Sequence, residues 1–316
     1  TAVEEIFPTL NSGAALVLRG PEVLISGRQL VEIISKEQLS VIDLPTAYWH
    51  QIIRELEETG QQVPQSLRLV VLGGDKISAE RFNAWNKLAS KDIRLLNTYG
   101  PTETTVISTS YETTTADKER AEIEEIPIGR PLPNTTAYVL DANMQPVPPG
   151  IPGELYTGGI CLAHGYLNRP DLTAERFIPD PFSNKPGSRL YRTGDLVCFR
   201  PDGNIDFLGR VDHQVKIRGF RVEIPEVENR LNQFEGLQAG IVIPRKDADG
   251  LNRLIGYYTI KPEFNENNVN PEKIRSFLNE SLPEYMVPAA FIKLDKIPYT
   301  PSGKIDIQNL PLPDNV

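Results

Sequence analysis

Short aliphatic runs that alternate with segments of helical spacing constrain the first part of this chain more than any other feature. Leu67–Leu72 is a near-continuous aliphatic run, which is typical of a parallel strand buried on both faces. It lies between Ala47–Leu56, with apolar residues at helical spacing, and Ser78–Leu88, which opens with a serine cap. Leu39–Ile42 and Ile93–Leu96 add two more strands. This alternation predicts a layered α/β architecture up to about residue 110.

The start of the chain is unusual. Residues 1–35 indicate the start of a helix, a turn at Asn11-Ser12-Gly13, a strand at Ala14–Leu18 and a second helix. The first residues carry no cap, no leader and no initiating methionine. We therefore expect this chain to be a piece of a longer protein.

A different pattern begins at Ile126, where short β runs are interrupted by proline and glycine. The runs are Ala137–Leu140, Glu154–Gly158, Leu190–Asp195 and Asn204–Leu208. Their length and spacing predict a small β subdomain that packs on the first layer.

A third pattern, of mixed strands and helices, follows Asp212. Predicted strands are His213–Val222, a hairpin of Ala239–Pro244 with Leu254–Ile260, and Ala290–Leu294; predicted helices are Ile224–Phe234, with Pro225 in its first turn, and Asn270–Leu282. We expect two regions, an α/β part with its β subdomain at 1–211 and a small α+β domain at 212–316.

Composition excludes several classes of function. The formal net charge is −9 with no basic block, so nucleic acid and anionic membranes are not expected partners. No apolar run approaches the roughly 20 residues of a membrane span. Cys161 and Cys198 are the only cysteines, and neither has a partner at metal-ligand spacing. The sequence therefore favours a reduced, cytoplasmic setting without a zinc site.

The strongest motif for chemistry is Asn97–Thr105, with the sequence NTYGPTETT. It follows a predicted strand, at the end where α/β proteins place their ligand-binding loops. Gly100 and Pro101 impose a turn, and hydroxyls around the Glu103 carboxylate suit phosphate and a hard cation such as Mg²⁺. The same composition also suits a threonine-rich surface turn, so residue types alone leave both interpretations open.

Three further motifs are weak when each is taken alone. Asp195, in YRTGDL, sits at a glycine turn and could accept hydrogen bonds from ribose hydroxyls. Arg210 and the basic residues after Asp212 could meet phosphates or form the exposed face of a strand. Lys304, in TPSGKID, lies on a Ser-Gly turn, where a lysine is solvated unless an anion site is near.

Taken together and in order, the motifs resemble those of the adenylate-forming superfamily, and most closely the adenylation domains of nonribosomal peptide synthetases. Segments AHGYLNRP (163–170) and TAERF (173–177) favour the peptide-synthetase branch over the acyl-CoA synthetases. The matching segments are Asn97–Thr105, Gly153–Gly159 with Gly165-Tyr166, Tyr191–Leu196, Asp212–Glu223, Leu282–Pro288 and Ser302–Asp306.

The resemblance implies a set of site roles and two cofactors, ATP and Mg²⁺. It places Tyr99 against adenine beside Asn97 and Gly100, Thr102 at phosphate, Glu103 on Mg²⁺, and Asp195 on the ribose near Arg210. It makes Lys304 the catalytic lysine of adenylation and Asp212 the hinge between a large subdomain, partly present as 1–211, and a small mobile C-terminal subdomain at 212–316.

The resemblance also implies a side-chain pocket for the amino-acid substrate. Its residues would be Thr1, Glu4, Asp43, Val71, Gly73, Gly74, Thr98, Val106 and Ile107. Spacing alone would leave Glu4 and Asp43 in solvent. If both face the pocket, two carboxylates select a cationic side chain: lysine or ornithine, then arginine.

The implied function is activation of an amino acid as aminoacyl-AMP and its transfer to the phosphopantetheine thiol of a downstream carrier domain, among neighbouring synthetase domains. The family's phosphate loop and the aspartate that binds the substrate amine are absent from this sequence. We therefore expect the isolated chain to be inactive. The alternatives are an acyl- or aryl-CoA ligase of the same superfamily and a catalytically inactive fragment.

Overall fold

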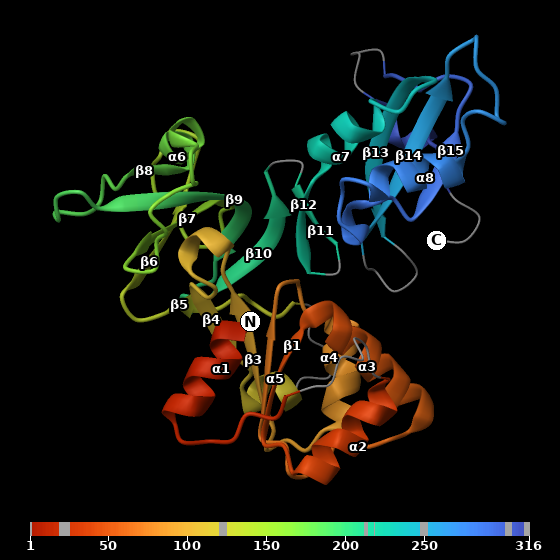
Figure 1. The fold of residues 1–316 in the computed structure, drawn as a ribbon. Coiled ribbons are helices and arrows are strands. Elements are labelled where there is room, and N and C mark those ends of the chain that lie inside the picture. Colours follow the sequence, from red (N-terminus) through yellow and green to blue (C-terminus); the bar gives the residue numbers. More distant parts are fainter. Residues whose placement is uncertain are drawn as a thin grey trace. The chain divides into compact units, whose positions relative to one another are not determined.

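The computed structural model describes residues 2–18, 26–119, 125–211, 214–217, 219–246, 252–300 and 305–312. The chain forms two compact units, Thr1–Asp212 and His213–Val316, and each has a hydrophobic core of its own (Figure 1). None of the described helices is long and apolar enough to cross a membrane.

The first unit is built on a five-stranded sheet. Its strands, in spatial order, are β1 (Val41–Pro45), β2 (Leu69–Gly73), β3 (Arg94–Tyr99), β4 (Thr109–Glu112) and β5 (Arg130–Pro131). The pairs β1–β2 and β2–β3 are parallel, whereas β3–β4 and β4–β5 are antiparallel. The predicted α/β layer is therefore present, and a parallel core carries an antiparallel edge.

Three helices cover one face of this sheet: α2 (Gly27–Glu37), α3 (Thr46–Thr59) and α4 (Ala79–Leu88). Val70, Leu72 and Leu95 of the sheet are fully buried against this layer. Local signals set the helix limits, because Ser26 and Ser78 cap α2 and α4 and left-handed Gly60 ends α3.

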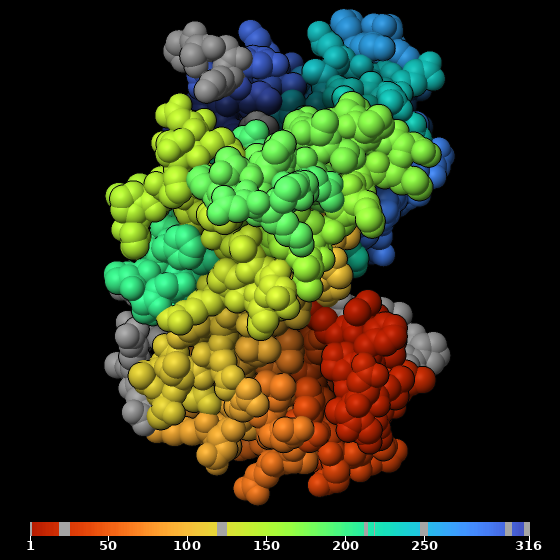
Figure 2. All heavy atoms as spheres, turned by 90° about the vertical axis from the view of Figure 1, so that its left-hand side faces the viewer, coloured from red at the N-terminus to blue at the C-terminus, as the bar shows by residue number. Residues whose placement is uncertain are grey.

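Helix α1 (Ala2–Asn11) lies on the other face of the sheet and has no buried residue (Figure 1). Its apolar side chains are exposed; Val3, Phe7 and Leu10 are each more than half exposed. Figure 2 shows this red helix at the surface of the first unit. The short helix α5 (Thr115–Glu119) follows β4.

An antiparallel sheet completes the first unit. Its order is β10 (Ile205–Arg210), β9 (Arg189–Phe199), β7 (Gly153–Gly159) and β6 (Thr135–Leu140); β8 (Phe177–Pro179) pairs with β9 and follows α6 (Pro170–Arg176). Leu155, Val197 and Ile205 of this sheet share a core with Tyr99 of β3. The predicted β subdomain is thus packed on the α/β layer.

The second unit is a small α+β structure. It contains a hairpin of β11 (Gln214–Ile217) and β12 (Phe220–Glu223), and a three-stranded sheet of β13 (Leu237–Lys246), β14 (Asn252–Ile260) and β15 (Ala290–Lys293). Helices α7 (Ile224–Leu231) and α8 (Pro271–Asn279) pack on that sheet, and η2 (Glu284–Met286) and η3 (Ile307–Asn309) are short 3-10 turns. Pro225 lies in the first turn of α7 and Asn270 caps α8, as predicted.

Two sequence-based predictions of strands are wrong. Ala14–Leu18 forms no strand, because no described strand pairs with it, and Leu18 is 81% exposed. The alternation of His213–Val222 predicted one strand, but the described residues form the β11–β12 hairpin. Gly219 reverses the chain with φ +83°, a conformation that an alternating apolar pattern does not reveal.

Candidate functional site

The loop Gly100–Ser108 doubles back on its own start. The amide of Ser108 donates to the carbonyl oxygen of Tyr99 at 2.8 Å. A Cβ on Gly100 would collide with the carbonyl oxygen of Val106, so this close approach requires glycine. Thr105 and Val106 have φ values of 55° and 72°, which for β-branched side chains costs about 1–3 kcal/mol each. The surrounding structure therefore imposes this loop conformation.

A buried polar cluster lies where β3 meets the antiparallel sheet. The Tyr99 hydroxyl donates to Oδ2 of Asp195, and Nη1 of Arg210 lies 2.5 Å from Oδ1 of the same carboxylate. Asp195 is only 3% exposed, so its charge depends on this guanidinium for compensation. Burial raises the pKa of Tyr99 well above its usual value, and the negative charge of Asp195 raises it further, so the phenol stays a proton donor. The structure thus joins three of the predicted nucleotide-site residues.

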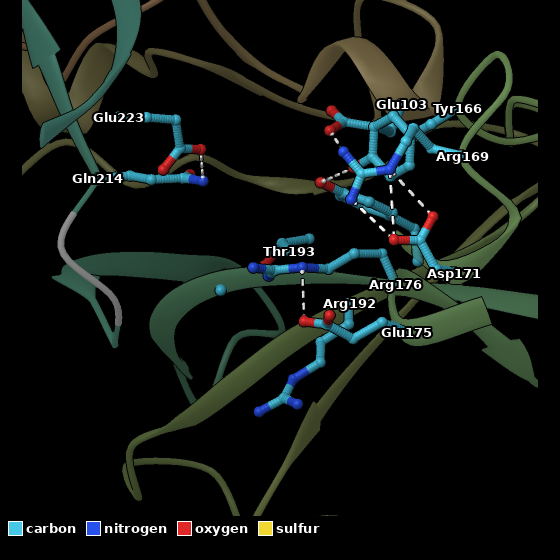
Figure 3. Close-up of polar contacts among 12 residues, drawn as sticks. Glu103, Tyr166, Arg169, Asp171, Glu175, Arg176, Arg192, Thr193, Gln214 and Glu223 are labelled. Carbon is cyan, nitrogen blue, oxygen red and sulfur yellow. Dashed lines mark hydrogen bonds and ion pairs between the residues drawn. The ribbon is translucent and has the colours of Figure 1, made fainter. Parts of the chain in front are cut away.

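Glu103 lies in a 3-10 turn, η1 (Thr102–Thr104), directly after β3. Its Oε1 accepts a hydrogen bond of 2.6 Å from the Tyr166 hydroxyl (Figure 3). Within the part of the chain that the structure describes, no cluster of three or more His, Cys, Asp or Glu side chains could hold a metal. A single carboxylate fits Mg²⁺, which proteins often bind through one or two carboxylates together with substrate phosphates.

Four of the predicted pocket residues share one face of the parallel sheet. Asp43 pairs in register with Val71, and Gly73 pairs two positions further on with Thr98. Because side chains alternate along a strand, this face is opposite to the one that carries Val70, Leu72 and Leu95. A Cβ on Gly73 would come within 2.7 Å of the Thr98 hydroxyl oxygen, so glycine keeps this face open.

Helix α1 brings a second acid to this face. The carboxyl groups of Glu4 and Asp43 are hydrogen-bonded partners. Burial, and next the neighbouring Glu4, raise the pKa of Asp43 to about 7. Two carboxyl groups that share a site resist full ionisation, and a cation between them would relieve the cost. The structure places both acids together, where spacing alone favoured solvent.

The remaining predicted residues take varied positions. Asn97 points to the opposite face from Thr98 and donates to the carbonyl oxygen of Pro127 at 2.7 Å. Gly74 follows β2 with φ +90°, Thr102 is exposed in η1, and Val106 and Ile107 are partly buried in the loop after it. Thr1, Asp212 and Lys304 lie outside the described residues.

The segment Cys161–Tyr166 lies beside Glu103, although its residues suggested no role in the site. The Thr105 hydroxyl donates to the carbonyl oxygen of Cys161 at 2.6 Å, and the Ala163 amide donates to that of Glu103 at 2.9 Å. Gly165-Tyr166 lies within one of the segments that match the family's motifs, and this match was the sequence signal that could have identified the segment. The hydrogen bond between Tyr166 and Glu103 joins residues 63 positions apart.

Comparison with known families gives two matches. Residues 1–167 match the AMP-binding enzyme family, and residues 226–304 match the AMP-binding enzyme C-terminal domain.

Curated relatives align along nearly the whole chain. Bacitracin synthase 3 of Bacillus licheniformis is 43% identical over 313 residues, which are 99% of this chain and 5% of that protein. Tyrocidine synthase 1 of Brevibacillus parabrevis is 40% identical over 314 residues, 99% of this chain and 27% of that protein. The chain therefore spans a small part of these relatives.

Two solved structures of nonribosomal peptide synthetase proteins are similar to this chain in fold. PA1221, an NRPS protein containing adenylation and PCP domains, has a TM-score of 0.79 and 26% identity, with coverage of 94% of this chain and 56% of that chain. The four-domain nonribosomal peptide synthetase AB3403, bound to AMP and glycine, has a TM-score of 0.59 and 36% identity, with coverage of 99% and 22%.

Proposed function

Because this chain belongs to the AMP-binding enzyme family, as part of an adenylation domain of the nonribosomal peptide synthetase type, we propose that it activates an amino acid with ATP. The products of this step are aminoacyl-AMP and pyrophosphate, and the aminoacyl group then passes to the thiol of a carrier domain. The proposal assigns this activity to the longer polypeptide that carries the chain. The observation behind it is that Tyr99, Asp195, Arg210 and Glu103 gather at the carboxyl end of β3 in a chain of this family.

The proposed nucleotide site uses the buried cluster. Asp195 accepts hydrogen bonds from the ribose hydroxyls, and Arg210 compensates its charge. Tyr99 borders the adenine with Asn97, and its hydroxyl orients the Asp195 carboxylate. Thr102, exposed in η1, lies where it can donate to a phosphate oxygen.

Glu103 is the proposed ligand of Mg²⁺. A bound Mg²⁺ would neutralise charge on the phosphates during attack by the substrate carboxylate. The chain's own contribution is to fix one buried carboxylate at the end of β3.

Two further roles come from the family resemblance. Lys304 bridges the substrate carboxylate and the α-phosphate during adenylation, and so offsets the repulsion of two anions. Asp212 is the hinge about which the unit His213–Val316 moves between the two half-reactions.

The acid pair supports a basic amino acid as the proposed substrate. Glu4 and Asp43 meet on the sheet face that carries Val71, Gly73 and Thr98. A long cationic side chain that lies above these small and aliphatic residues would pair with both carboxylates, in place of their hydrogen bond to each other. We propose lysine or ornithine, then arginine, since a guanidinium needs more width than an ammonium.

Pyrophosphate exchange by the longer polypeptide tests the whole proposal. We expect exchange with lysine or ornithine above all other amino acids. Glu4→Gln should lower kcat/KM for that substrate about 10- to 100-fold, whereas Glu58→Gln, on an exposed turn of α3, should not.

Other results separate the alternatives. Strongest exchange with leucine, phenylalanine or glutamate would refute the substrate assignment but keep adenylation. No exchange with any amino acid, together with CoA-thioester formation from another carboxylic acid, would identify the rival ligase. Neither activity in the longer polypeptide would identify an inactive module.

A further inference from the structure

We propose that the segment Cys161–Tyr166, here called the clamp loop, positions the Glu103 carboxylate, and that Tyr166 is its positioning residue. This inference rests on the proposed function, because it assumes that Glu103 binds a divalent cation beside ATP.

The clamp loop holds the η1 turn at three points. The Thr105 hydroxyl donates to the carbonyl oxygen of Cys161 at 2.6 Å, just after the turn. The Ala163 amide donates to the carbonyl oxygen of Glu103 at 2.9 Å. The Tyr166 hydroxyl donates to Oε1 of Glu103 at 2.6 Å (Figure 3). Backbone and side chain of Glu103 are therefore tied to the same short loop.

The clamp loop is itself anchored from outside. The Arg189 guanidinium donates to the carbonyl oxygens of Ala163 and His164, at 2.9 Å each. The Tyr166 amide donates to the hydroxyl oxygen of Thr173 at 2.9 Å. Gly165 has φ +146°, and a Cβ there would collide with the Thr173 side chain. These contacts make the loop a rigid support rather than a mobile connection.

The Tyr166 ring is fixed as firmly as its backbone. Phe177 packs edge-on against it with ring centroids 5.6 Å apart, and the hydroxyl of Tyr191 lies 3.4 Å from that of Tyr166. These contacts hold the phenol where its hydroxyl donates to the Glu103 carboxylate.

This arrangement explains how a single carboxylate can serve a cation. A glutamate side chain has three rotatable bonds, and freezing them on metal binding costs entropy. A hydrogen bond from an already ordered donor removes part of that cost beforehand. Partners that orient a metal-binding carboxylate are commonly worth 10- to 100-fold in metal affinity.

Tyr166→Phe in the longer polypeptide removes the hydroxyl and keeps the ring. The matched control is Tyr111→Phe, because the Tyr111 hydroxyl also donates to a carboxylate, that of Asp117, at 2.6 Å. Mn²⁺ replaces Mg²⁺ as a paramagnetic probe, and its binding with a non-hydrolysable ATP analogue is titrated by electron paramagnetic resonance. We expect Tyr166→Phe to weaken Mn²⁺ binding about tenfold and Tyr111→Phe to leave it unchanged.

A double-mutant cycle sharpens the test. In a Glu103→Gln background, Tyr166→Phe should weaken Mn²⁺ binding no further, since the carboxylate that it orients is gone. Equal Mn²⁺ affinities in Tyr166→Phe, Tyr111→Phe and wild type would refute the positioning role but not the proposed function. Equal losses of Mn²⁺ affinity in Tyr166→Phe and Tyr111→Phe would do the same. Wild-type protein that binds no Mn²⁺ with the nucleotide analogue would overturn both this inference and the proposed function.

Discussion

Asp43→Asn should stabilise the adenylation domain without substrate while it weakens the domain's activity on a basic substrate. Burial, and next the neighbouring Glu4, raise the pKa of Asp43 from 3.8 to about 7. At 1.36 kcal/mol for each pH unit between these two pKa values, ionisation of Asp43 would destabilise the fold by about 4 kcal/mol. Part of the side chain remains in contact with solvent, so we expect Asp43→Asn to stabilise the fold by about 2 kcal/mol.

The sign of the pH dependence follows from linkage. The folded state binds the Asp43 proton more tightly than the unfolded state does, so ionisation destabilises the fold. This penalty is absent below about pH 4, grows as the pH rises, and is complete above about pH 7. Asparagine removes it, so the gain in stability should be near zero at pH 4 and greatest at pH 8.

Urea unfolding of wild type and variant at both pH values measures this difference. Asp92→Asn, at an exposed turn position, is the matched control and should change stability little at either pH. Pyrophosphate exchange with lysine or ornithine should fall in Asp43→Asn and stay unchanged in Asp92→Asn. If Asp43→Asn is no more stable than wild type at pH 8, or is equally stabilised at both pH values, then Asp43 does not form a buried acid pair with Glu4.

Three further predictions concern the longer polypeptide and the isolated chain. Lys304→Ala should reduce adenylation about 100- to 1,000-fold and spare thiol transfer from preformed adenylate; equal losses in both half-reactions would refute its role. Asp212→Pro should impair one half-reaction selectively, because proline fixes φ at a hinge, and two unchanged rates would refute the hinge. Residues 1–316 alone should aggregate and show no pyrophosphate exchange, since β1 is an edge strand and the apolar side chains of α1 are exposed. Robust exchange by this chain would contradict that expectation.

Elements with local signals were predictable from the sequence. Helix α4 begins after its serine cap and ends at Leu88, and the aliphatic run forms the strand β2, as predicted, although only its alternate residues Val70 and Leu72 are fully buried. Capping and hydrophobic periodicity act within a few residues, so the sequence displays them directly. The strand expected at Ala14–Leu18 failed because a strand also needs a neighbour, and pairing is not a local property.

The same distinction between local signals and contacts of distant residues applies to the candidate site. The residue order is enough to identify the available side chains, including the motif around Glu103 and the glycine turn before Asp195. Which of these side chains meet depends on the folded chain, which pairs Tyr99 with Asp195, Glu4 with Asp43, and Tyr166 with Glu103. Each pair joins different elements, and its contact depends on strand register and on the packing of α1 and the clamp loop. Burial at those contacts then sets the pKa of Asp43, which no motif encodes, because desolvation is a property of the folded surroundings.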